Sequence, residues 1–147
     1  MHILLVEDND DDIELTQLAF DQNRIANRLD VVKNGEQALS YLFRRDEFAH
    51  RKDDPLPALI LLDLKLPGLH GLEVLEQLRA NSTTRHLPVV VLTSSREQED
   101  MLQSYERGAN SFIRKPVDFG KFKEAVHQLQ LYWLVLNESP FKQPQED

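Results

Sequence analysis

Apolar residues follow two different spacings along the chain, and each spacing predicts a different element. Short segments rich in apolar residues predict five strands, at residues 2–7, 29–33, 58–62, 88–92 and 111–114, and the first has the pattern of a strand buried on both faces. The intervening segments have helical spacing, and the first, residues 11–20, places Leu15, Leu18 and Ala19 on its apolar face. Strands that alternate with helices predict an α/β fold, a five-stranded parallel sheet flanked by five helices.

Local signals mark where several elements begin and end. Asn34, with Gln37 in the capping-box position, predicts the start of the second helix. Gly108 predicts the end of a helix over residues 97–107. The polar segment 44–57 predicts a long loop. The charged residues expected to be solvated in this loop are Arg44, Arg45, Asp53 and Asp54.

Composition narrows the classes of function. The chain has 147 residues, no cysteine and a net charge of −8, so disulfides and thiolate nucleophiles are excluded. Its basic residues are scattered, which argues against direct nucleic-acid binding. The five histidines have no metal-ligand spacing and are expected to be surface or packing residues. No basic leader or long apolar run is present, so we expect a cytoplasmic protein without a membrane partner.

Polar residues follow four of the predicted strands. Glu7 and Asp8 follow the first strand, Asp63 the third, Thr93 the fourth and Lys115 the fifth. The carboxyl ends of parallel strands meet at one edge, so these side chains are expected to converge in one crevice. Carboxylates held this close repel one another, and a hard cation such as Mg²⁺ relieves the repulsion. The set suits phosphoryl transfer, because it offers an oxygen nucleophile, a metal site and donors for phosphoryl oxygens.

Four segments resemble the receiver family of bacterial two-component signalling: residues 4–9, 61–71, 90–95, and 108–109 with 115–116. The resemblance spans roughly residues 2–130. It implies that Asp63 is the phosphoacceptor and that Mg²⁺ binds Asp8, Asp63 and the backbone carbonyl of Lys65. It also implies that Glu7 binds the metal through water.

The same resemblance implies roles for residues on the last two strands. Thr93 and Lys115 would grip the phosphoryl group, and Lys115 and Pro116 would be joined by a cis peptide. Thr93 and Phe112 would form the switch, although Phe112 stands where the family often has tyrosine. The long loop and the segment 132–134 resemble small regulators paired with bacterial and cyanobacterial phytochrome kinases. The implied partner is therefore a sensor histidine kinase.

Three other functions fit the sequence less well. A phosphatase with an aspartate nucleophile needs a second acid two residues after it, where this chain has Lys65. A nucleotide-binding module needs a glycine-rich loop after the first strand, where this chain has acids. A degenerate receiver that serves only for docking would have an incomplete set of acids. We expect a phosphoacceptor that assists its own Mg²⁺-dependent phosphorylation and dephosphorylation and signals by protein contact.

The C-terminal segment suggests an interface. We expect a receiver domain over residues 1–136, with an extended last helix, followed by a short polar tail at 137–147. Residues 131–136 are apolar or aromatic without a break, so they cover the whole circumference of a helix. One domain can bury only one side of such a helix. The other side could be covered by a second copy, by the kinase or by the tail at Pro140 and Phe141. A second copy is the simplest choice, so a homodimer surface is predicted at Leu131, Tyr132, Leu134 and Val135.

Overall fold

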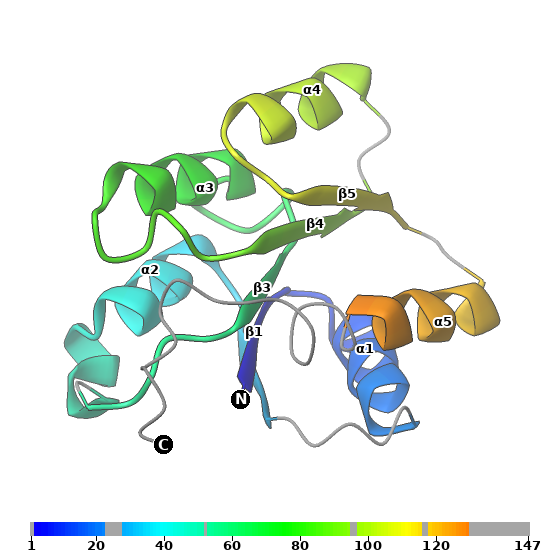
Figure 1. Ribbon diagram of the computed structural model, residues 1–147, viewed down its shortest axis with the longest axis horizontal. Coiled ribbons are helices and arrows are strands. Elements are labelled where there is room, and N and C mark those ends of the chain that lie inside the picture. The colour runs from blue at the N-terminus through cyan, green and yellow to red at the C-terminus, as the bar shows by residue number, and fades with distance from the viewer. Residues whose placement is uncertain (1, 23–27, 52, 95–96, 116–117, 130–147) are drawn as a thin grey trace, which may run out of the picture.

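A computed structural model of the protein shows a parallel five-stranded sheet between two layers of helices (Figure 1). The structure describes residues 2–22, 28–51, 53–94, 97–115 and 118–129. The strand order is β2-β1-β3-β4-β5, which confirms the predicted fold class. The elements in chain order are β1 (His2–Val6), α1 (Asp10–Gln22), β2 (Arg28–Val32), α2 (Gly35–Phe43), the 3₁₀ helix η1 (Asp46–Arg51), β3 (Leu59–Leu62), α3 (Gly71–Ala80), β4 (Val89–Thr93), α4 (Gln98–Glu106), β5 (Ser111–Arg114) and α5 (Phe119–Leu129).

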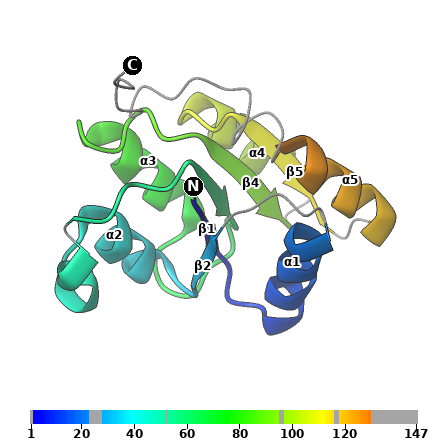
Figure 2. The same cartoon turned by 60° about the horizontal axis from the view of Figure 1, so that its bottom comes forward.

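The core lies on both faces of the sheet, because successive side chains of a strand point to opposite faces. On β1, Leu4 and Val6 join the core cluster beneath α2 and α3, whereas Ile3 and Leu5 join the cluster beneath α1 and α5. Figure 2 shows α1 and α5 together on one side of the sheet and α2 and α3 on the other. Burial on both faces explains why the three inner strands, β1, β3 and β4, are almost entirely apolar. The edge strands β2 and β5 are only partly buried and carry charged residues.

The apolar face expected for the first helix is wrong. Leu15 and Leu18 are 45% and 44% exposed, although Ala19 is buried as expected. The helix instead packs through Ile13, Thr16, Ala19 and Phe20. A buried threonine is tolerated here because its hydroxyl donates a hydrogen bond of 2.8 Å to the carbonyl oxygen of Asp12.

The second helix begins where its capping residues predict. The side chain of Asn34 accepts a hydrogen bond from the backbone N–H of Gln37 at 2.8 Å. The side chain of Gln37 in turn accepts from the backbone N–H of Lys33 at 2.9 Å, one residue before the cap. Two backbone donors are thereby satisfied at the connection between β2 and α2.

The long connection between α2 and β3 is more ordered than a solvated loop. It contains η1, and the guanidinium carbon of Arg51 lies 3.6 Å from the centre of the Tyr41 ring. Arg51 also forms an ion pair with Asp54 at 3.2 Å, and Arg44 donates to the backbone carbonyl of Asp54. Arg44 and Asp54 are therefore partly buried and paired locally, whereas Arg45 and Asp53 are exposed as expected.

The side chain of Arg79 in α3 links the connection before β4 to the turn after α4. The guanidinium of Arg79 donates to the backbone carbonyl of Leu87 at 2.8 Å and to that of Gly108 at 2.6 Å. Gly108 has a φ of 97°, and an added Cβ would lie 2.7 Å from Nε of Arg79. The turn after α4 therefore needs glycine both for its backbone conformation and for the approach of the arginine.

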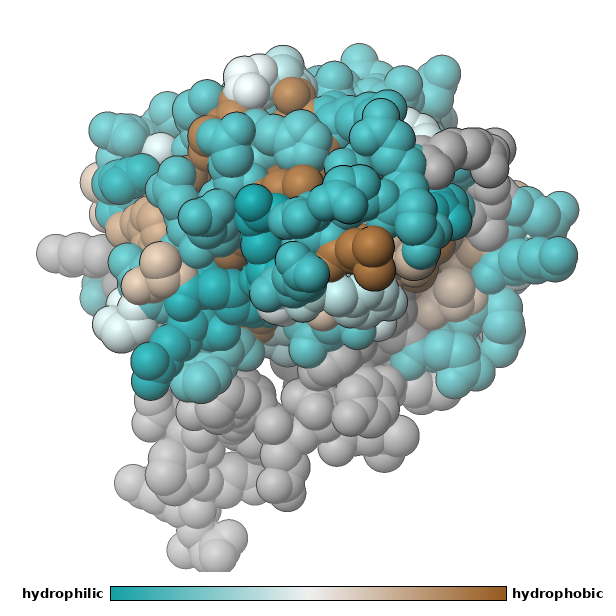
Figure 3. All heavy atoms as spheres, turned by 90° about the horizontal axis from the view of Figure 1, so that it is seen from above, coloured by the Kyte–Doolittle hydropathy of each residue, from teal (hydrophilic) through white to brown (hydrophobic). Residues whose placement is uncertain are grey.

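The molecular surface is mainly hydrophilic where Figure 3 shows it, and apolar patches there are separated by polar side chains. Among the described helices, none has the length and apolar character needed to cross a membrane.

Candidate functional site

Backbone hydrogen bonds continue past the strand ends and fix the residues that follow them. The N–H of Glu7 donates to the carbonyl of Val32 at 3.0 Å, and the N–H of Asp63 donates to that of Val6 at 3.0 Å. The N–H of Lys115 donates to the carbonyl of Thr93 at 2.8 Å. The site residues therefore extend the sheet, and their side chains emerge at its carboxyl edge.

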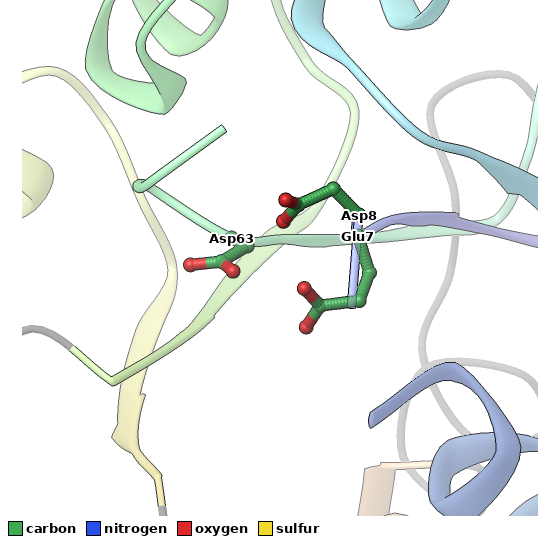
Figure 4. Close-up of side chains that lie close together, drawn as sticks. All are labelled: Glu7, Asp8 and Asp63. Carbon is green, nitrogen blue, oxygen red and sulfur yellow. The ribbon is translucent and has the colours of Figure 1, made fainter. Parts of the chain in front are cut away.

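Three carboxylates from two strand ends meet at this edge. Ligand oxygens of Glu7, Asp8 and Asp63 all lie within 4.8 Å of one another. Figure 4 shows Glu7 and Asp8 reaching from the end of β1 toward Asp63 at the end of β3. Glu7 and Asp63 are buried, whereas Asp8 is exposed. The cluster is therefore open to solvent on the side of Asp8.

The negative charges of this cluster are only partly balanced by nearby positive charge. Burial raises the pKa of Glu7 to about 7, and the hydrogen bond from Lys115 opposes this shift, while the charge on Asp63 adds to it. Two buried carboxylates thus compete for a single ammonium. Several close carboxylate oxygens with access to water form the donor set that Mg²⁺ prefers, and a divalent ion would relieve their repulsion. The residues present therefore fit a hard divalent cation.

The ammonium of Lys115 lies among these acids. Its Nζ is 2.5 Å from Glu7, 2.7 Å from Asp12 and 3.7 Å from Asp63. Burial alone would lower the pKa of Lys115, but hydrogen bonds to Asp12 and Glu7 raise it above its usual value. The lysine is therefore held protonated beside the central carboxylate.

Asp12 is not predicted as a site residue from the sequence, because it lies within the first helix and not directly after a strand. One signal was present in the sequence. Asp12 lies in the first turn of α1, which directly follows the strand end that carries Glu7 and Asp8.

The loop after β3 packs tightly against the central carboxylate. The N–H of Lys65 donates to Oδ1 of Asp63 at 3.2 Å, and the N–H of Gly71 donates to the carbonyl of Leu64 at 2.8 Å. A Cβ on Gly71 would lie only 2.4 Å from the carbonyl oxygen of Asp63. The start of α3 can approach this strand end only because residue 71 is glycine.

Thr93 and Phe112 lie on the neighbouring strands β4 and β5. Thr93 is fully buried at the end of β4, and its register partner on β5 is Arg114. Phe112 is partly buried against the core cluster beneath α2 and α3, and the guanidinium of Arg114 lies 5.6 Å from its ring centre. The aromatic side chain is thus neither fully packed nor fully exposed.

Some expected features lie outside the described residues. These are Pro116, and with it the peptide bond to Lys115, and the interface residues Leu131, Tyr132, Leu134 and Val135.

Comparison with known proteins agrees with this geometry. Residues 3–127 match the response regulator receiver domain. The chain is 40% identical to the probable methanogenesis regulatory protein FilR2 of Methanothrix harundinacea, over 94% of this chain and 86% of that protein. It is 35% identical to response regulator Rcp1 of Synechocystis, over 90% of this chain and 88% of that protein.

Solved structures extend the likeness. The phosphorylated cyanobacterial phytochrome response regulator RcpA is 34% identical, with a TM-score of 0.85 and coverage of 95% of this chain and 97% of RcpA. The Mn²⁺-bound form of response regulator Rcp1 is also 34% identical, with a TM-score of 0.83 and coverage of 95% and 98%.

Proposed function

Because this chain belongs to the response regulator receiver domain family, we propose that Asp63 accepts a phosphoryl group from a sensor histidine kinase. One observation carries the proposal. A buried carboxylate at the end of the central strand lies beside two further acids and 3.7 Å from a lysine ammonium. Phosphoryl transfer needs this combination, because catalysis there rests on positioning and charge stabilisation.

In the proposed reaction, one carboxylate oxygen of Asp63 forms a bond to phosphorus while the bond from phosphorus to the donor nitrogen of the kinase breaks. Mg²⁺, held by Asp8, Asp63 and the carbonyl of Lys65, with Glu7 acting through water, would neutralise charge on the phosphoryl oxygens. The ammonium of Lys115 donates to one of these oxygens, and the hydroxyl of Thr93 donates to another. The same groups assist phosphorylation by small phosphodonors and later hydrolysis.

A phosphodonor experiment tests the assignment. The chain incubated with acetyl phosphate and Mg²⁺ should gain an acid-stable, base-labile phosphoryl group, and Asp63→Asn should lose it. Asp53→Asn is the matched control, because Asp53 is exposed in the connection before β3. A phosphoryl group of equal yield on Asp63→Asn would contradict the proposal.

The rival phosphatase function makes a different prediction. Lys65 stands where a leaving-group acid would be required, so we expect no sustained turnover of a phosphate ester. Continuous release of phosphate from such an ester, lost in Asp63→Asn, would favour the phosphatase instead.

The likeness to RcpA, a phytochrome response regulator, supports a kinase of the phytochrome type as the donor. We place this protein and its kinase in the cytoplasm. Phosphotransfer from a panel of purified histidine kinases would test this partner, and a phytochrome kinase should be the fastest donor. Equal rates across unrelated kinases would contradict the pairing.

The unbroken apolar run at residues 131–136 supports a homodimer. Light scattering should give a dimer for the full chain and a monomer for a chain that ends at Gln130. If both are monomers at tens of micromolar, with and without beryllofluoride, the run has another role.

A further inference from the structure

The ammonium of Lys115 is already engaged before any phosphoryl group arrives. An ammonium has three donors, and Lys115 directs Nζ at Glu7 and Asp12, at 2.5 and 2.7 Å. The contact with Asp63, at 3.7 Å, is longer than a charge-assisted hydrogen bond, which is about 2.7–2.9 Å. The lysine thus pairs more closely with these two acids than with the central carboxylate.

The backbone of Asp12 is anchored independently of its carboxylate. Its N–H donates to Oδ1 of Asn9 at 2.9 Å, and its carbonyl accepts from the hydroxyl of Thr16 at 2.8 Å. The side chain contributes nothing to either bond, so its bond to Lys115 is separable from the start of α1.

The two acids that hold Lys115 differ in their surroundings. The side chain of Glu7 is 2% exposed, whereas that of Asp12 is 34% exposed. Water can replace the lysine at Asp12, but it reaches the buried carboxylate of Glu7 poorly. The bond to Asp12 is therefore the less costly of the two to break.

We propose that Asp12 is a positioning residue that competes with phosphorylated Asp63 for the ammonium of Lys115. The inference rests on the proposed function and adds a residue to it. A phosphoryl group on Asp63 brings new anionic oxygens to the edge of the sheet, and Lys115 must share its charge with them. Asp12 retains part of that charge and shifts the balance toward the unphosphorylated form.

Beryllofluoride, which mimics the phosphoryl group, allows the competition to be measured as an equilibrium. Titration of the full chain with beryllofluoride at saturating Mg²⁺ should give about three- to tenfold tighter binding for Asp12→Asn than for wild type, the range expected for a partly buried ion pair. Asp11→Asn is the matched control. It removes the same charge from the same turn of α1, and Asp11 is exposed; its affinity should stay within about twofold of wild type.

A second background separates competition from simple repulsion. In Lys115→Met, the added Asp12→Asn change should leave beryllofluoride affinity unaltered, because no ammonium remains to be released. Urea unfolding without Mg²⁺ should show coupling between positions 12 and 115 and none between positions 11 and 115.

The outcomes distinguish the two levels of the argument. Wild type that fails to bind beryllofluoride with Mg²⁺ would overturn the proposed function, and this inference with it. Wild type that binds, with Asp12→Asn unchanged, would overturn the inference alone. An equal gain in the Lys115→Met background would also overturn it, because the effect would then be charge repulsion by Asp12.

Discussion

A buried histidine at the far end of the sheet should make stability depend on pH. His2 opens β1, is 4% exposed and pairs in register with Arg28 of β2. Its ring lies 6.5 Å from the ring of Tyr41 in an edge-on arrangement. Among the described residues, none is a hydrogen-bond partner for its Nε2. The ring is therefore poorly prepared to carry a charge.

The pKa of His2 falls from 6.5 to about 4, first because of burial and then because of the positive charge of Arg28. Asp30 opposes this shift and Arg51 adds to it, whereas Tyr41 packs beside the ring. Between these pH values the unfolded chain binds more protons than the folded chain. Stability from His2 is therefore complete above about pH 6.5 and is lost as pH falls toward 4.

The expected magnitude follows from the linkage relation. The full difference between pH 6.5 and about 4 is worth about 3 kcal/mol, because each pH unit contributes about 1.36 kcal/mol. Between pH 7.5 and 5.5, the contribution of His2 should fall by about 1 kcal/mol.

Urea unfolding at these two pH values tests the prediction. His2→Leu should lose about 1 kcal/mol less stability than wild type on acidification. Glu7 has a raised pKa and acts in the opposite direction, so the comparison must be made between variant and wild type. His50→Gln is the control, because His50 is exposed and should leave the wild-type pH dependence unchanged. Identical pH dependence for His2→Leu and wild type would refute the reasoning.

Three other changes test the packing and charge of the molecule. In urea titrations, Gly71→Ala should lower the free energy of unfolding by about 1–3 kcal/mol, because the added Cβ would clash with the backbone. Gly120→Ala is the control and should change this free energy by less than about 0.5 kcal/mol, because the nearest atom to its Cβ would be a side-chain oxygen at 3.2 Å. Calorimetry should show that Mg²⁺ binds about tenfold more weakly at pH 6 than at pH 8, because a protonated Glu7 opposes the metal. Glu7→Gln should remove most of this pH dependence. If the variant keeps the pH dependence of wild type, Glu7 is not its cause. Arg51→Met should lower the free energy of unfolding by about 1–2 kcal/mol, because it removes the contact with the Tyr41 ring. Arg45→Met should lower it by less than about 0.5 kcal/mol, because Arg45 lies 5.2 Å from the centre of the Phe43 ring. Equal losses in the two variants would count against the contribution of the Tyr41 contact.

The inner strands β1, β3 and β4 were predictable because their residues are buried on both faces, so apolar runs indicate them directly. The edge strands β2 and β5 are only partly buried, and their apolar runs are shorter. The first helix was harder to interpret. Leu15 and Leu18 have the same helical spacing as a packed face, yet Thr16 is the buried neighbour because its hydroxyl is satisfied within the helix. Helical spacing alone does not indicate which of two overlapping sets of residues packs against the sheet.

The candidate site was predictable wherever strand ends determine it, since parallel strands bring Glu7, Asp63 and Lys115 to one edge. The bond between Asp12 and Lys115 joins residues 103 positions apart and depends on the rotation of α1. No local pattern in the sequence specifies that rotation.

The connection that carries η1 joins the carboxyl end of α2 to the amino end of β3. Asp63 follows the opposite end of that strand, so the length of the sheet separates the two regions. Arg51 and Tyr41 anchor the connection locally, and its exposed residues Ala49 and His50 face solvent. This segment can accumulate insertions during evolution, or accept a peptide tag, without rearranging the phosphoacceptor edge. It is a natural attachment point for a reporter that follows the protein while its chemistry proceeds undisturbed.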